Sequence, residues 1–170
     1  METFEAIRTM LAVRKYRKEP IPDDVVGRIV EAARLTGSSK NLQPWQFVVV
    51  RDSSTLSELG SLARSGPYIA EARLAIAVAY EKSSVYGVSD ASRAVQSMML
   101  AAWEAGVGSN WVGFDNLSTI GARLGIPEDF GLLAVLSFGY PVDRIGKGKK
   151  NRKALAEIAH SERFGTPFGA

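Results

Sequence analysis

The stretch Gly37–Val50, GSSKNLQPWQFVVV, decides how the rest of the chain is arranged around it. Its first half gathers two hydroxyls and two amides, from Ser38, Ser39, Asn41 and Gln43. Short polar side chains of this kind bond to nearby backbone and favour turns, and the valine-rich second half is typical of a strand. Such a turn can offer hydrogen bonds to a flat polar ligand. The alternative is a plain helix-to-strand connection, which the turn chemistry alone favours.

The segments on either side of this stretch alternate between helical and strand patterns. Apolar periodicity and breaking residues predict helices over residues 3–11, 23–37, 53–64, 90–107, 118–125 and 154–159. Runs of β-branched and apolar residues predict strands over residues 46–51, 73–80 and 132–140, with a short strand or turn at 109–114. Between them, residues 13–16 are expected to be extended.

This order of elements predicts an α+β fold in which helices sandwich a central sheet. The strand at 73–80 is apolar on both faces, which indicates a central position in the sheet. The helix at 90–107 is apolar nearly all round, which favours packing against a second subunit across an interface and therefore a dimer. Neither a repeat nor a domain boundary is visible, so residues 1–170 are expected to form one domain.

Composition removes several classes of chemistry. The chain of 170 residues has no cysteine and a single histidine, His160. Disulfides, thiolate catalysis and a multi-histidine metal site are therefore excluded. No apolar run is long enough to cross a membrane, and the first residues are too polar for a signal peptide, so we expect a cytoplasmic protein without a membrane partner.

The net charge of +3 comes largely from one basic run near the C-terminus. The run contains Arg144, Lys147, Lys149, Lys150, Arg152 and Lys153. Such a run is usually a solvated face or a phosphate contact. No aromatic or glycine pattern accompanies it, so we expect no nucleic-acid partner.

Four motifs, in order and at compatible spacing, resemble those of the FMN-dependent nitroreductase family. The family's Arg-Arg-Ser-x-Arg-x-Tyr corresponds to Met10–Tyr16, MLAVRKY, and its Pro-Ser-Ser-x-Asn-x-Gln-Pro-Trp to Gly37–Trp45. A turn similar to Gly-Leu-Gly-x-x-Trp is found at Gly106–Gly113, GVGSNWVG. The closing Gly-Tyr-Pro and Lys-x-Arg correspond to residues 139–141 and 150–152. Each motif is weak alone, but the four together are specific and cover nearly the whole chain.

The resemblance implies a nitroreductase-like α/β/α sandwich with a mostly antiparallel sheet, in an intertwined homodimer that binds FMN at the subunit interface. It implies an oxidoreductase that takes hydride from NADH or NADPH and reduces small-molecule electron acceptors, namely nitroaromatics, quinones or flavins, in a ping-pong cycle. The alternative is a degenerate flavin-binding homodimer that serves FMN storage, delivery or a partner complex.

The resemblance also assigns cofactor-binding residues to the two subunits of such a dimer. From one subunit, the isoalloxazine ring would be contacted by Ser38, Ser39 and Asn41. From the other, Trp111, Val112 and Gly113 would present backbone near flavin N5. Lys150 and Arg152 would bind the phosphate, and Arg14 would lie beside the pyrimidine or ribityl side. FMN itself carries the redox chemistry, so no side chain is expected to act as acid or base.

The chain departs from the family pattern at the first motif. Met10 and Leu11 stand where the family has arginines, and Ala12 stands for its serine. The phosphate site loses a strong donor, which Arg8, about one turn earlier, could replace. For Arg14 the alternative is a surface arginine paired with Glu19 or Asp23.

Overall fold

The computed structural model describes residues 1–113, 115–143 and 150–169 of the chain. At its centre lies a four-stranded sheet in the order β1-β2-β4-β3, with every neighbouring pair antiparallel. The strands are β1 (Trp45–Val50), β2 (Leu74–Glu81), β3 (Gly108–Val112) and β4 (Phe130–Gly139). Of the segment 109–114, predicted as a short strand or turn, residues 109–112 belong to β3, which forms one edge of the sheet.

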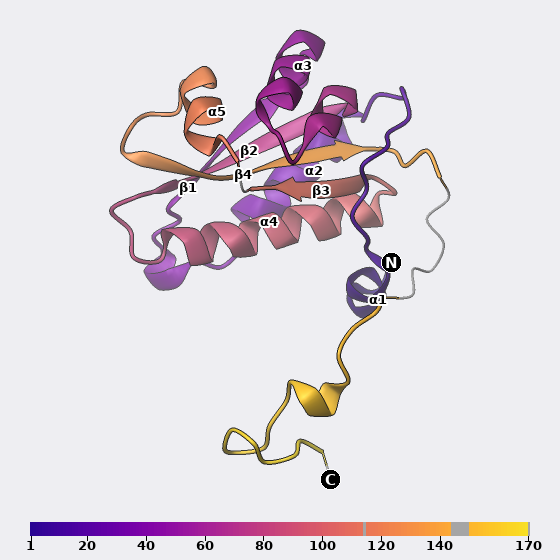
Figure 1. Ribbon diagram of the computed structural model, residues 1–170, viewed down its shortest axis with the longest axis vertical. Helices are drawn as coiled ribbons and strands as arrows, with labels where there is room; N and C mark the ends of the chain where they lie inside the picture. Colours follow the sequence, from indigo (N-terminus) through magenta and orange to yellow (C-terminus); the bar gives the residue numbers. More distant parts are fainter. Residues whose placement is uncertain (114, 144–149, 170) are drawn as a thin grey trace.

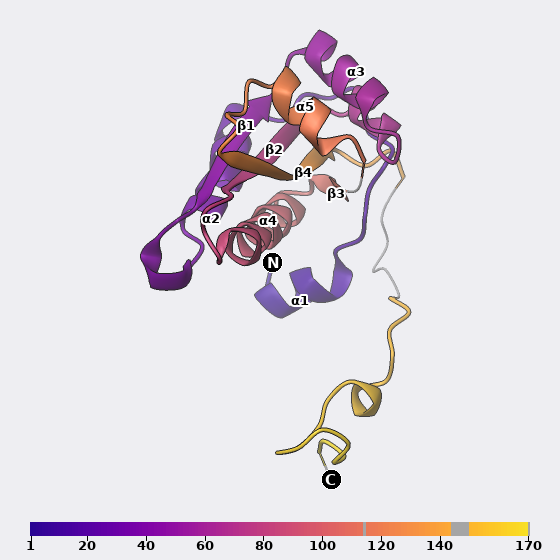
Figure 2. The ribbon, with the colours of Figure 1, turned by 60° about the vertical axis from the view of Figure 1, so that its left-hand side comes forward.

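Helices cover both faces of this sheet (Figures 1 and 2). The helices are α1 (Thr3–Thr9), α2 (Asp23–Arg34), α3 (Ser53–Leu62), α4 (Gly87–Glu104) and α5 (Leu117–Arg123). Short 3-10 turns occur at η1 (Ser39–Asn41), η2 (Pro67–Glu71) and η3 (Leu155–Glu157). One apolar cluster joins α2 and α4 to the sheet, and a second joins α3, α5 and η2 to its other face. The predicted α/β/α sandwich with an antiparallel sheet is confirmed.

Strand β2 shows why two apolar layers form. Leu74, Ile76 and Val78 belong to the cluster on the α2 and α4 side. Ala75 and Ala77, at the alternate positions, belong to the cluster on the α3 and α5 side. Because side chains alternate between the faces of a strand, an apolar residue at every position indicates burial on both faces, as the sequence predicted.

Several predicted bounds differ from the structure, and two of the differences have a clear physical reason. Residues 154–159 do not form a helix but only the single turn η3, where Leu155 and Ile158 are both 61% exposed. A short helix needs a buried apolar face to be stable, and this segment has none. Helix α4 begins at Gly87 rather than at residue 90. Gly87 packs beneath the Tyr80 ring, where a Cβ atom would lie 2.8 Å from Tyr80 Cδ2.

The extended segment around Arg14 lies along the β3 edge of the sheet. Ala12 forms a parallel bridge with Ser109, and Tyr16 forms an antiparallel bridge with Pro141. The buried Tyr16 hydroxyl donates to the carbonyl oxygen of Val13 at 2.7 Å. Burial raises the pKa of Tyr16, so its hydroxyl stays protonated. These contacts hold Arg14 beside the start of β3 and the end of β4.

Residues 150–169 extend away from the body of sheet and helices (Figures 1 and 2). The apolar side chains of this tail are exposed, with Phe164 at 95% and Phe168 at 51%. Three residues of the basic run, Arg144, Lys147 and Lys149, lie outside the residues that the structure describes. Within the described ranges, no helix is long and apolar enough to cross a membrane.

Candidate functional site

The loop from Ser38 to Gln43, which we call the amide loop, has an unusual backbone. Lys40, Asn41 and Gln43 have φ values of 54°, 57° and 51°, in the left-handed region that residues other than glycine seldom adopt. The Ser38 hydroxyl accepts a hydrogen bond of 3.0 Å from the backbone N–H of Gln43. The Gln43 side chain donates to the Asn41 carbonyl at 3.2 Å and to its Oδ1 at 3.3 Å. The loop is therefore a closed, internally bonded turn.

Helix α4 supports this loop through a buried carboxylate. Asp90, with no exposed surface, accepts 2.9 Å and 3.2 Å bonds from the Ser39 amide and hydroxyl. It also forms an ion pair with Arg93, one turn further along α4. Burial opposes ionisation of the carboxyl, but the Ser39 and Arg93 donors outweigh it and lower the pKa of Asp90. The group is an anion at neutral pH, with donors on both oxygens.

Arg14 lies exposed at the opposite edge of the sheet. Its guanidinium carbon is 5.9 Å from the centroid of the Tyr68 ring, within the range of a cation–π contact. The Tyr68 hydroxyl in turn accepts a hydrogen bond from the Asn110 amide on β3. Within the described part of the chain, Arg14 forms no ion pair, and Asp23 is paired with Arg51 instead. The alternative of Arg14 as a partner of Glu19 or Asp23 is therefore wrong.

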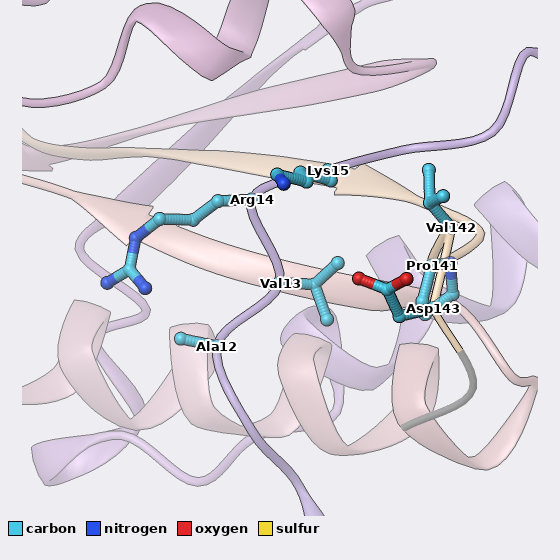
Figure 3. A pocket seen from close by; sticks show the side chains of 7 residues that line it. All are labelled: Ala12, Val13, Arg14, Lys15, Pro141, Val142 and Asp143. Carbon is cyan, nitrogen blue, oxygen red and sulfur yellow. The ribbon is translucent and has the colours of Figure 1, made fainter. Parts of the chain in front are cut away.

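A cavity of about 170 Å³ lies along the Arg14 segment. Ala12, Val13, Arg14 and Lys15 line one side of it, and Pro141, Val142 and Asp143 line the other. In Figure 3 the Arg14 guanidinium and the Asp143 carboxylate lie at opposite ends of this group of side chains. The guanidinium therefore points away from this acid and toward the part of the molecule that holds Tyr68 and Asn110.

The Trp111–Gly113 segment ends strand β3 on the same edge. Val112 is buried, with 2% of its surface exposed, and it packs in the apolar cluster on the α3 and α5 side of the sheet. Gly113 has no room for a side chain, because a Cβ atom there would lie 2.3 Å from Trp111 Nε1. A glycine also lets the backbone approach a flat ligand closely. The structure gives a second reason for glycine at this place, since glycine leaves space for the indole ring of Trp111.

The tail residues Lys150 and Arg152 make few contacts with the body. Lys150 Nζ donates to the Ile7 carbonyl at 2.5 Å, and partial burial and the neighbouring Arg152 lower the pKa of its amine. Arg152 is exposed and donates to the Asn151 carbonyl at 2.8 Å. Arg8 forms a two-pronged ion pair with Glu5 at 2.7 Å and 2.8 Å. It is thus already engaged on α1 rather than lining the cavity beside Arg14.

Apart from Lys150 and Arg152 on the tail, the predicted site residues therefore fall into two groups within one chain. Ser38, Ser39 and Asn41 precede edge strand β1, whereas Trp111, Val112 and Gly113 end edge strand β3, next to Arg14. Three strand spacings separate the edges, which is roughly 14 Å. Strands β2 and β4, which are covered by apolar clusters on both faces, lie between the two edges, so the two groups do not face a common space within a single chain. We call them the amide half-site and the arginine half-site.

Sequence reasoning missed the residues that support each half-site. Asp90 supports the amide loop, and Tyr68 and Asn110 accompany Arg14. Asp90 was visible as a polar residue at the start of an otherwise apolar helix, which is ordinary helix-start chemistry. Its complete burial beneath a loop 51 residues earlier in the chain is a tertiary contact that no local pattern reveals.

The fold and motif positions can be compared with known proteins. The sequence profile of the nitroreductase family matches residues 7–83 and 67–140 of this chain. The chain belongs to the nitroreductase family. Membership fits the antiparallel sandwich and the order of the four motifs.

Relatives of this nitroreductase-family chain match most of its length. A protein of Archaeoglobus fulgidus, provisionally named NADH dehydrogenase/NAD(P)H nitroreductase, is 35% identical over 84% of this chain and 87% of its own. A provisionally named nitroreductase of Desulfovibrio desulfuricans, solved in complex with FMN, is 28% identical, with a TM-score of 0.84 over 96% and 98% of the two chains. An FMN-dependent nitroreductase of Clostridium difficile is 26% identical, with a TM-score of 0.85 over 95% and 99%.

Proposed function

We propose that this chain is an FMN-dependent oxidoreductase that uses NADH or NADPH to reduce small acceptors, namely nitroaromatics, quinones or flavins. Family membership supports the reaction type, and the FMN complex of the Desulfovibrio desulfuricans relative supports the cofactor. The observation that carries the proposal is the division of the motif residues into two half-sites that a second copy of the chain would unite.

The proposed active unit is a homodimer with one FMN at each of two equivalent interface sites. Two-fold symmetry pairs the amide half-site of one copy with the arginine half-site of the other, twice. The tail supports an intertwined arrangement, since it leaves its own body and exposes Leu155, Ile158, Phe164 and Phe168. Exposed apolar surface of this extent favours burial against a second copy.

The chain's donor set fits FMN. The amide loop offers partly exposed Ser38 and Ser39 and an exposed Asn41 at the proposed ring contact. The arginine half-site offers a guanidinium that no described carboxylate neutralises, and the tail adds an amine and a second guanidinium for a phosphate. Charge-assisted donors of this type bind phosphate strongly.

The residues of the two half-sites have separable tasks in the proposed reaction. FMN supplies the hydride chemistry when bound. Arg14 places a permanent positive charge beside the ring and so favours the reduced, anionic form of the cofactor. Ser38, Ser39 and Asn41 fix the ring in place, and Lys150 and Arg152 bind the phosphate. The carboxylate of Asp90 is buried beneath the amide loop, and that of Asp143 lies at the far end of the cavity from the Arg14 guanidinium. Neither is placed to act as an acid, so protons would come from solvent.

The loss of the motif arginines favours a second candidate, a degenerate homodimer that binds FMN for storage, delivery or a partner complex. Met10 and Leu11 provide no phosphate donors, and Arg8 is paired with Glu5. A weakened phosphate site would release FMN readily. Turnover of the FMN-loaded protein separates this candidate from the enzyme.

The test of the proposed function begins with the absorption spectrum of the purified protein and identification of the released pigment by mass. Oxidation of NADH and of NADPH is then followed with a quinone or a nitroaromatic as acceptor. The proposal expects FMN at about one per chain and acceptor-dependent oxidation. FMN-loaded protein without turnover would favour the second candidate, and protein that takes up no FMN would reject both.

Two further expectations remain proposals. We propose that residues 1–170 act as one domain, since both apolar clusters are shared between sheet and helices along the whole described body. We also propose a cytoplasmic location, where NADH and NADPH would be supplied. Fractionation of cells that carry a tagged chain tests the location, and recovery in a membrane or exported fraction would refute it.

A further inference from the structure

The amide loop holds a strained backbone that its own sequence does not explain. Three residues other than glycine, Lys40, Asn41 and Gln43, have positive φ within four positions. Such conformations persist only where the surrounding structure enforces them. The bonds among Ser38, Asn41 and Gln43 close the turn on itself but do not fix it to the body.

The connection between the loop and the body is made by the first turns of α4. Asp90 accepts from both the amide and the hydroxyl of Ser39, and Arg93 pairs with the same carboxylate and approaches the Ser39 hydroxyl at 3.4 Å. Lys40 adds a contact 5.9 Å from the centroid of the Tyr86 ring, just before α4. Among the residues that the structure describes, Asp90 is the only buried residue with a charged side chain.

We propose that Asp90 is a positioning residue for flavin binding, which fixes the amide loop so that Ser38, Ser39 and Asn41 face the cofactor in a preformed arrangement. The proposal rests on the proposed function, because it takes the amide loop to be the part of one copy that contacts the ring. Asp90 itself lies beneath the loop and touches no cofactor.

A carboxylate is the group that this place requires. An ionised carboxylate only accepts hydrogen bonds, and the Ser39 amide, the Ser39 hydroxyl and Arg93 are all donors. Asparagine has the same shape, but its NH₂ group would face one of these donors. The Asp90→Asn variant therefore keeps the packing of α4 and removes the anchor of the loop.

The experiment combines hydrogen–deuterium exchange of the flavin-free protein with titration of FMN and riboflavin. For Asp90→Asn we expect the amides of residues 38–43 to exchange about tenfold faster and both flavins to bind about tenfold more weakly. Equal losses are expected because the loop contacts the ring that the two flavins share. Exchange in β2, at the centre of the sheet, should stay unchanged.

Glu58→Gln is the matched control, because it also removes one carboxylate from an arginine pair, on α3 and far from the loop. It should change neither measurement. If Asp90→Asn fails to fold because Arg93 is left unpaired, Asp90→Asn with Arg93→Met removes both charges together, and the same losses are expected. Wild-type loop exchange or wild-type flavin affinity in the folded variant would overturn the proposal. Wild-type protein that binds no flavin would instead overturn the proposed function.

Discussion

The two half-sites differ in how firmly the chain holds them. In the amide half-site, backbone and side chains are closed by hydrogen bonds to one another and to a buried anion on α4. In the arginine half-site, Arg14 rests on one aromatic ring, and the proposed phosphate donors Lys150 and Arg152 lie on a tail that extends from the body. The amide half-site is organised within the single chain, whereas we propose that the arginine half-site acquires its partners on assembly and cofactor binding.

The largest effect on FMN binding is expected from Lys150 and Arg152, the proposed phosphate donors on the tail. Arg152→Ala with Lys150→Ala should weaken FMN binding by about 100-fold, because two charge-assisted contacts are lost. Riboflavin, which has no phosphate, should bind as it does to the wild type. Titration of both flavins by fluorescence measures the difference. Equal losses for the two flavins would show that these residues do not bind the phosphate.

A smaller effect is expected at Arg14, and it concerns the redox potential rather than retention. Arg14→Ala removes a positive charge beside the ring and should make the two-electron midpoint potential more negative by about 30 mV, a tenfold change in the redox equilibrium. Potentials are measured against a reference dye. Lys18→Ala, the same loss of charge on an exposed neighbouring residue, is the control. A potential unchanged in Arg14→Ala would refute the placement of Arg14.

A still smaller effect is expected at Tyr68, which supports Arg14. Tyr68→Leu removes the ring beneath the guanidinium and should reproduce part of the Arg14→Ala shift, since a cation–π contact at an exposed site contributes about 0.5–1 kcal/mol. Tyr68→Phe keeps the ring and loses only the bond from Asn110. Its potential should stay near that of the wild type. If the two variants behave alike, the ring does not position Arg14.

The smallest effect is expected in the stability of the protein at acid pH, and it concerns Asp90, which supports the amide half-site. Because the pKa of Asp90 is lowered from 3.8, its contribution to stability is complete above that value and is lost as pH falls through the lowered pKa. Arg93 and Lys40 are the neighbouring cations. The difference in unfolding temperature between the wild type and Asp90→Asn should be constant between about pH 7 and pH 5. It should become smaller as the pH falls below 3.8. A gap that closes near neutral pH would contradict this assignment.

The sequence predicted the sandwich because its local signals were consistent. Continuous apolar runs predict β2 and β4, and a capping residue, Asp52, predicts the start of α3. Tertiary packing preserves all three elements. The helix predicted at 154–159 does not form, because tertiary packing does not support its local signal. Its apolar residues have nothing in the same chain to pack against, and propensity alone does not stabilise a helix of that length.

The candidate site was predictable residue by residue but not in its supports. The motifs located Arg14, the amide loop and the end of β3, and the structure gathers them into two groups at opposite sheet edges. The pairs Ser39–Asp90 and Tyr68–Asn110 join residues 51 and 42 positions apart. Contacts of that range depend on how the layers pack, which no motif contains.

The most direct test of the central claim is complementation between two defective copies. One copy carries Ser39→Ala and Asn41→Ala, the other carries Arg14→Ala and Arg152→Ala, and each is expected to lose FMN on its own. Co-expressed with different affinity tags and purified through both, the mixed dimer has one intact site, so about one FMN per two chains and restored NADH oxidation are predicted. A mixed dimer as free of flavin as its parents would show that the two half-sites do not meet between copies, and would contradict the account.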